Sequence, residues 1–236
     1  MKNTFSLLVC SMMIFGSAAA MAETDPVKVP EIFNKIYIPI GFDSNDHIQV
    51  VGEGIHQTSC FRNAEAQVHV DQQNMRIELD PQAYQYNGIC LQVLVPFTKI
   101  VDIGILKTGK WEVVQGANRG PSAILNVRQA TTDNADDYLY APISQAFYSQ
   151  SKAGRQVILT GEFSNNCMTL TSVKTDIQPD VIVLQPISEM ATRANCAAGH
   201  FPFSRTVNIS TAKPGRYLLH VRSLNGNAVN SLIDVK

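Results

Sequence analysis

Five histidines are the residues of this chain best suited to act as a general base or to bind a metal. No two of them have the spacing of a metal-binding pair. The chain contains no HExxH, CxxC or GxSxG motif and no glycine-rich phosphate loop. We therefore expect no catalytic residue, no bound metal and no other cofactor. The five are His47, His56, His69, His200 and His220.

Two polar patterns resemble known functional motifs, but each lacks some of the residues that the motif requires. Ser149 and Lys152 match the SxxK acylation motif, yet they stand in a polar stretch without the companion motifs. The acidic stretches 43–46 and 133–137 offer carboxylate oxygens for Ca²⁺, yet neither contains the glycine and the distal glutamate of an EF-hand loop. We interpret both acidic stretches as solvated loops and leave Ca²⁺ binding open.

A better candidate for binding is the stretch before Cys90, which contains Tyr84 and Tyr86. A disulfide at Cys90 would hold this stretch firmly. Aromatic residues on a rigid loop are common anchors of binding surfaces. We name Tyr84 and Tyr86 a candidate binding loop; the alternative is that both rings pack on their own domain.

The elements that position these residues repeat along the chain. Cys60 precedes Cys90 by 30 residues, and Cys167 precedes Cys196 by 29. Such matched spacings favour an internal duplication. A duplicated unit repeats its own bridge, so we expect disulfides Cys60–Cys90 and Cys167–Cys196. Further landmarks return 106 residues on: Pro96, Phe97, Lys107, Gly109 and Trp111 match Pro202, Phe203, Lys213, Gly215 and Tyr217.

The first 22 residues have the pattern of a secretory signal peptide. Lys2 is followed by an apolar run from Phe5 to Phe15 and by small residues that end at Ala22. Cleavage after Ala22 would remove Cys10 and leave four cysteines in an oxidising compartment. No later stretch reaches the roughly 18 apolar residues of a transmembrane helix. We expect a periplasmic or secreted protein without a transmembrane segment in the mature chain.

Charge gives little indication of a partner. Charged residues make up 17% of the chain, and the net charge is -1, whereas about a quarter of an average chain is charged. No cluster of lysine and arginine indicates binding to nucleic acid or to an anionic membrane.

Hydrophobic residues alternate along most of the chain with the period of β-strands. Stretches 66–70 and 75–79 alternate around a polar turn, which predicts a hairpin with one buried face. Leu91, Val93 and Val95 continue the alternation after the second cysteine. Glycines in the stretches 47–55 and 156–163 indicate a bulge or a close backbone approach. Only the stretch 187–195 leaves room for a turn or two of helix.

These patterns predict an all-β protein of two tandem antiparallel β-sandwich domains that arose from an internal duplication. The first domain spans residues 36–128 and the second spans residues 139–236. Residues 129–138 lack apolar periodicity and are expected to be the linker.

The repeated motif of a strand, Lys-x-Gly-[Lys/Arg]-aromatic and a second strand resembles the corner before the penultimate strand of immunoglobulin-like and fibronectin-like sandwiches. The motif begins at Lys107 and at Lys213. This resemblance implies immunoglobulin-like domains of the kind found in exported bacterial proteins. The length is also similar to that of periplasmic pilus chaperones, which carry a basic residue in their cleft; Lys28 and Lys35 precede the first strand.

The sequence therefore favours an exported, non-catalytic binding or scaffolding protein of the bacterial envelope. Its partner would be another envelope or extracellular macromolecule and not nucleic acid. One alternative is a chaperone-like assembly factor of the periplasm. The other is a hydrolase whose site gathers a histidine and carboxylates from distant strands.

Overall fold

The computed structural model describes residues 25–116, 120–134, 136–152, 154–192 and 195–236. Within them the chain forms seventeen strands and no α-helix, so the prediction of an all-β protein is confirmed. None of these residues belongs to a helix long and apolar enough to cross a membrane. The predicted signal peptide, residues 1–22, lies outside the described residues.

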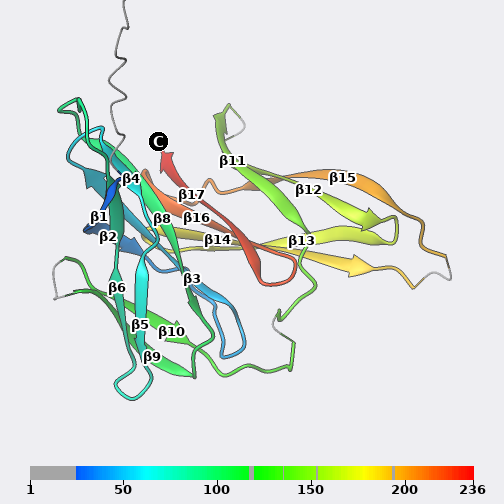
Figure 1. Ribbon diagram of the computed structural model, residues 1–236. Helices are drawn as coiled ribbons and strands as arrows, with labels where there is room; N and C mark the ends of the chain where they lie inside the picture. Colours follow the sequence, from blue (N-terminus) through cyan, green and yellow to red (C-terminus); the bar gives the residue numbers. More distant parts are fainter. Residues whose placement is uncertain (1–24, 117–119, 135, 153, 193–194) are drawn as a thin grey trace, which may run out of the picture.

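In the first half of the chain, two sheets enclose an apolar core (Figure 1). Their strand orders are β2-β3-β8 and β10-β9-β6-β5. Side chains of a strand point alternately to its two faces, which places Ile77 and Leu79 of β6 beside Trp111 in the core. The strands are β2 (Phe33–Tyr37), β3 (Ile48–His56), β5 (Gln67–Asp71), β6 (Arg76–Asp80), β8 (Val95–Gly104), β9 (Gly109–Gln115) and β10 (Ala123–Val127).

The second half has the same arrangement around its own core. Strand orders β11-β12-β15 and β13-β14-β16-β17 reproduce those of the first half position by position. The core includes Leu159, Leu184 and Leu219. The strands are β11 (Ile143–Ser151), β12 (Gly154–Asn165), β13 (Met168–Ile177), β14 (Val181–Met190), β15 (Ala198–Asn208), β16 (Gly215–Ser223) and β17 (Asn227–Val235).

Both four-stranded sheets contain one parallel pair, β6 with β9 and β14 with β16. The prediction of purely antiparallel sheets is therefore wrong at these pairs. After β6 and after β14 the chain crosses to another sheet and returns, and a crossover of this kind permits parallel pairing, which a tight hairpin does not.

A small third sheet belongs to the first half alone among the described residues. Its order is β1-β7-β4, with β1 (Val27–Pro30), β7 (Gln82–Gln85) and β4 (Phe61–Asn63). It lies at the same end of the molecule as the loop between β7 and β8 (Figure 1). We call this sheet the mini-sheet.

The two halves pack against each other through the outer faces of their sheets. Tyr37 and Val51 contact a patch formed by Val181, Val183 and Leu218, and all five are buried. Ion pairs border this apolar contact: Lys35 with Asp180 at 3.1 Å and Arg216 with Glu53 at 2.6 Å. The halves therefore form a continuous interface.

Two local predictions are wrong. The stretch 187–195 is not helical where it is described, because Ile187–Met190 completes β14 and pairs with β13. Residues 91–94 are not a strand but part of a loop, and β8 begins only at Val95.

Both predicted disulfides are present, Cys60–Cys90 and Cys167–Cys196. The glycine prediction is confirmed at Gly52 and Gly54, because the rings of Phe33 and Phe97 occupy the space of a β-carbon.

Candidate functional site

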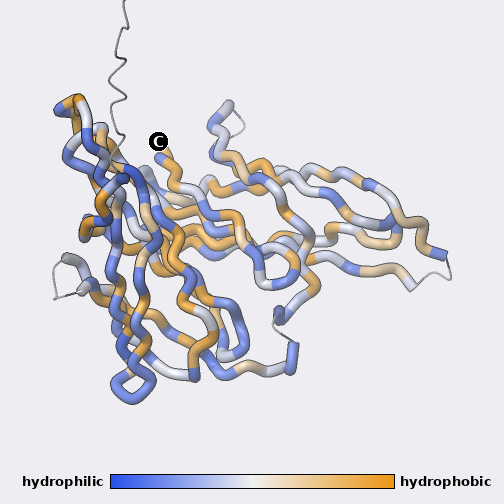
Figure 2. Tube along the Cα trace, viewed as in Figure 1, coloured by the Kyte–Doolittle hydropathy of each residue, from blue (hydrophilic) through white to orange (hydrophobic). Residues whose placement is uncertain are grey.

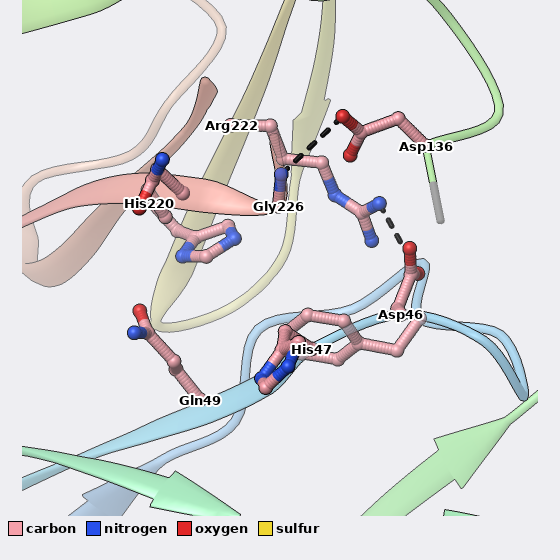
Figure 3. A pocket seen from close by; sticks show the side chains of 10 residues that line it. Asp46, His47, Gln49, Asp136, His220, Arg222 and Gly226 are labelled. Carbon is pink, nitrogen blue, oxygen red and sulfur yellow. Dashed lines mark hydrogen bonds and ion pairs between the residues drawn. The ribbon is translucent and has the colours of Figure 1, made fainter. Parts of the chain in front are cut away.

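Arg222, near the end of β16, forms a buried ion pair with Asp46, which precedes β3 (Figure 3). Its Nη1 lies 3.2 Å from Asp46 Oδ2, and its Nη2 donates a hydrogen bond of 2.7 Å to the Gly41 carbonyl. The rings of Phe42 and Tyr140 flank the guanidinium. A buried charge is tolerated only when it is paired and hydrogen-bonded. Both terminal nitrogens of Arg222 have such partners, whereas its Nε has none among the described residues.

The two acidic stretches lie side by side around this arginine. Asn45 Nδ2 donates to the Thr132 and Asn134 carbonyls, each at 2.8 Å. Asp43 and Asp46 are buried, so the interpretation of the first stretch as a solvated loop is wrong. Burial is the main cause that raises the pKa of Asp43, Asp46 and Asp136.

The guanidinium thus supplies the positive charge that a Ca²⁺ ion would supply in an acidic cluster. Across the described ranges, no three histidine, cysteine, aspartate or glutamate side chains are arranged to hold a metal ion. A calcium site therefore has no support in this geometry.

His220 lies beside Arg222 on β16 and is also buried. The Asn230 Nδ2 amide donates a hydrogen bond of 3.0 Å to Gln49 Oε1. Asn230 Oδ1 therefore accepts a hydrogen bond of 2.7 Å from His220 Nδ1–H. Gln49 in turn donates to Asp102 at 2.8 Å. Burial lowers the pKa of His220 to about 4, so the imidazole is neutral at pH 7.

His220, Asp46 and Asp136 come from distant segments, which is the gathering of histidine and carboxylates that a hydrolase would need. The pocket that they line has a volume of about 10 Å³. A water molecule needs a cavity of about this size, whereas ligand sites commonly measure about 300 to 1,000 Å³. This pocket has no room for a substrate, and we interpret it as a polar junction between the halves.

His47 also lines this pocket, whereas His200, His56 and Ser149 lie elsewhere. His200 is exposed and pairs with Glu162, and their hydrogen bond raises the pKa of His200. His56 Nδ1 lies 3.0 Å from Glu31 Oε1, at the base of the mini-sheet. Ser149 lies in β11 rather than at the start of a helix, so the SxxK pattern lacks its structural context.

The mini-sheet presents a row of two cations and one aromatic ring. Tyr84 of β7 lies directly opposite Lys28 of β1 on one side and Arg62 of β4 on the other. Residues directly opposite each other in a sheet share a face, and all three are exposed. Tyr86 continues along the same face, and its backbone N–H donates to the Cys60 carbonyl at 3.0 Å.

Beyond Tyr86 the chain forms an exposed apolar loop, residues 86–94. Ile89 is 102% exposed, Leu91 66%, Leu94 64% and Val93 48%. Figure 2 shows this loop as a hydrophobic tip at the upper left of the molecule. Contiguous apolar exposure marks interaction sites more often than scattered single residues do. We call residues 86–94 the apolar loop.

Covalent and hydrogen bonds fix the apolar loop to the turn directly before β4. The disulfide joins Cys90, at the centre of the loop, to Cys60 in this turn. Ser59 accepts a hydrogen bond of 2.9 Å from Leu91 N–H at its hydroxyl, and its own N–H donates to the Leu91 carbonyl at 3.1 Å. The loop is therefore held in place although its apolar side chains face solvent.

The base of the loop is packed into the first half. The His56 ring stacks on Phe97 with centroids 4.3 Å apart and on Phe61 at 5.8 Å. Phe61 belongs to the mini-sheet and Phe97 to the core. This stack connects the apolar loop to a rigid framework.

Sequence reasoning located Tyr84 and Tyr86 but missed the four aliphatic side chains that follow. Alternation of Leu91, Val93 and Val95 predicted a strand with a buried face. A second signal was present: no charged residue occurs between Asp80 and Lys99. A long uncharged stretch that includes Asn87 and Gly88, residues typical of turns, is compatible with an exposed apolar loop.

The comparisons with known proteins bear on the first half only. A family model, the ORF11 beta-sandwich domain, matches residues 50–121. The match runs from β3 to the region after β9 and includes the apolar loop. Together with the two facing sheets it establishes a β-sandwich fold there. No curated protein and no solved structure matches the chain.

Proposed function

We propose that this chain is an exported, non-catalytic binding protein of the bacterial envelope, in which the apolar loop is the contact surface. The observation that carries the proposal is the exposure of Ile89, Leu91 and Leu94 on a loop that a disulfide fixes to the turn directly before β4. Exposing these side chains to water costs free energy, about 1.5 to 3 kcal/mol for each fully exposed aliphatic residue relative to burial. A partner that covers the loop recovers this free energy.

The second half supports this function as a scaffold. Its strand orders repeat those of the first half, and its disulfide occupies the corresponding place. We propose that it is an immunoglobulin-like sandwich that arose by duplication. Its described residues form no counterpart of the mini-sheet. The difference between the copies supports the proposal that binding belongs to the first half, because loops diverge for function on a shared framework.

The chaperone alternative is less well supported. Lys35 forms an ion pair of 3.1 Å with Asp180 at the interface between the halves, whereas Lys28 lies on the mini-sheet. The two lysines therefore do not converge in one cleft. We do not propose a chaperone function.

Photochemical cross-linking in intact envelopes tests the proposal. Benzoylphenylalanine in place of Leu91 should give a discrete cross-linked product, because the side chain lies in the contact surface. The control places the same group at Ile124, which is 57% exposed on β10. Absence of any product at position 91, or an identical product at both positions, would reject the apolar loop as the contact surface.

A further inference from the structure

The exposed side chains at this end of the molecule become less polar from the mini-sheet toward the tip of the apolar loop. Lys28, Tyr84 and Arg62 form one row of the mini-sheet, and Tyr86 follows directly after the end of β7. The aliphatic residues of the apolar loop come last. The two cations thus share a row with Tyr84, Tyr86 follows them, and the aliphatic side chains lie nearest the tip.

This order matches the layers of a membrane surface. Acyl chains accept aliphatic side chains, aromatic residues favour the level of the headgroups, and lysine and arginine favour anionic phosphates. The tip projects from the molecule and has no charged residue between Asp80 and Lys99. A bilayer interface accepts such a projection without a complementary groove, which a protein partner would have to provide.

A third cation strengthens the positive charge at the base. Lys99 Nζ is enclosed by protein and has no hydrogen-bond partner among the described residues. Burial and the charge of Lys28 lower the pKa of Lys99, and only Glu65 acts in the opposite direction. An anion beside Lys28 would relieve this repulsion between like charges.

We infer that the apolar loop and the cationic row at its base bind the surface of an anionic lipid bilayer. Ile89, Leu91 and Leu94 enter the boundary of the acyl chains, and Lys28 and Arg62 contact lipid phosphates. The inference rests on the proposed function, because it names the partner of the same surface.

Vesicle co-sedimentation tests the inference with protein that begins at Glu23, which retains every described residue. The protein should bind vesicles of phosphatidylcholine and phosphatidylglycerol more tightly than vesicles of phosphatidylcholine alone. Combined Ile89→Ser and Leu91→Ser should weaken binding to the mixed vesicles at least tenfold. Ile124→Ser, at a residue of similar exposure on β10, should leave binding unchanged.

The cationic row is tested separately. Each cation near an anionic surface contributes on the order of a fivefold change in partitioning. Combined Lys28→Gln and Arg62→Gln should therefore weaken binding to the mixed vesicles about 25-fold, and should leave the residual binding nearly independent of phosphatidylglycerol and of salt. Thermal midpoints within a few degrees of the parent establish that all variants are folded.

Three outcomes overturn the inference. The first is the absence of vesicle binding by the parent protein, and the second is equal binding by the Ile89→Ser, Leu91→Ser variant. The third is self-association without vesicles that depends on the apolar loop, which would identify a second copy as the occupant. A protein cross-link at position 91 without vesicle binding would reject the lipid but leave the proposed function standing. Failure of both experiments would reject both.

Discussion

At the scale of single residues, several charged and polar side chains are buried, and several large aliphatic side chains are exposed. Arg222, Asp46 and His220 are almost completely buried, whereas Ile89 is fully exposed. The buried groups are stabilised by their partners, since an isolated charge in a protein interior costs several kcal/mol. The exposed groups have no compensation within the described residues, which is the physical basis of the binding proposal.

Tyr84 of the mini-sheet and Tyr86 of the apolar loop are expected to serve binding rather than stability. Tyr84 and Tyr86 are exposed, so Tyr84→Ala with Tyr86→Ala should shift the thermal midpoint by only a few degrees. Loss of rings at the contact surface should weaken binding to the mixed vesicles by about 2 kcal/mol for each ring that acts as a hot spot. Calorimetry and co-sedimentation give the two values. A large fall in the midpoint would instead place the tyrosines in the framework.

His220 is expected to make the protein less stable in mild acid. Its pKa falls from 6.5 to about 4 on folding, so the unfolded chain binds the proton first as the pH decreases. Stability is complete above the unfolded pKa and is lost between about pH 6.5 and pH 4, with a loss of about 2 kcal/mol at pH 5.

The carboxyls of Asp43, Asp46 and Asp136 act in the opposite direction, because desolvation raises their pKa and the folded state protonates them first. The measurement is therefore a comparison of urea unfolding at pH 7.5 and pH 5 for the parent and for His220→Gln. The parent should lose about 2 kcal/mol more than the variant. Equal losses would show that His220 is not the source of the acid sensitivity.

At the scale of elements, the first disulfide fixes a loop and the second provides a matched control. Each closes a loop of similar length, 30 and 29 residues. The chain-entropy model assigns about 3 to 4 kcal/mol to either bridge. Only the first lies beside the apolar loop.

Paired replacement of cysteines by serine separates stability from binding. Cys60→Ser with Cys90→Ser and Cys167→Ser with Cys196→Ser should each lower the free energy of unfolding by about 3 to 4 kcal/mol. Only the first pair should also weaken vesicle binding, because it frees the apolar loop from the turn directly before β4. Equal loss of binding in both variants would mean that the disulfide does not organise the contact surface.

At the scale of the whole molecule, the two halves have separate cores and a shared interface. Each core is formed by residues of one half. The interface includes the apolar patch around Leu218, its bordering ion pairs and the Arg222–Asp46 pair. Separate cores favour independent folding, and the interface favours additional stability in the intact chain.

Residues 139–236 alone should therefore fold cooperatively under oxidising conditions. We expect the fragment to be less stable than the intact chain, because separation exposes Val181, Val183 and Leu218 and removes Asp46 from Arg222. Thermal unfolding monitored by circular dichroism provides the comparison. An unfolded fragment beside a cooperative full-length protein would mean that the two cores depend on each other.

The sequence by itself determined the all-β class, the disulfide pairs and many of the strands. Alternation with a period of two is a local property, because each residue along a strand reverses the face of its side chain. The cysteine spacing is equally visible without a structure once the repeat is recognised. Tyr84 and Tyr86 were found in the same way, from their place before Cys90.

Only the tertiary structure decided what surrounds each face. The alternation of Leu91, Val93 and Val95 cannot show whether a second sheet or solvent lies opposite, and here it is solvent for Leu91 and Val93. Pairing of distant segments brought Lys28 and Arg62 to opposite sides of Tyr84 and placed both acidic stretches around Arg222. Neighbours across a sheet depend on strand register and topology, which spacing along the chain does not encode.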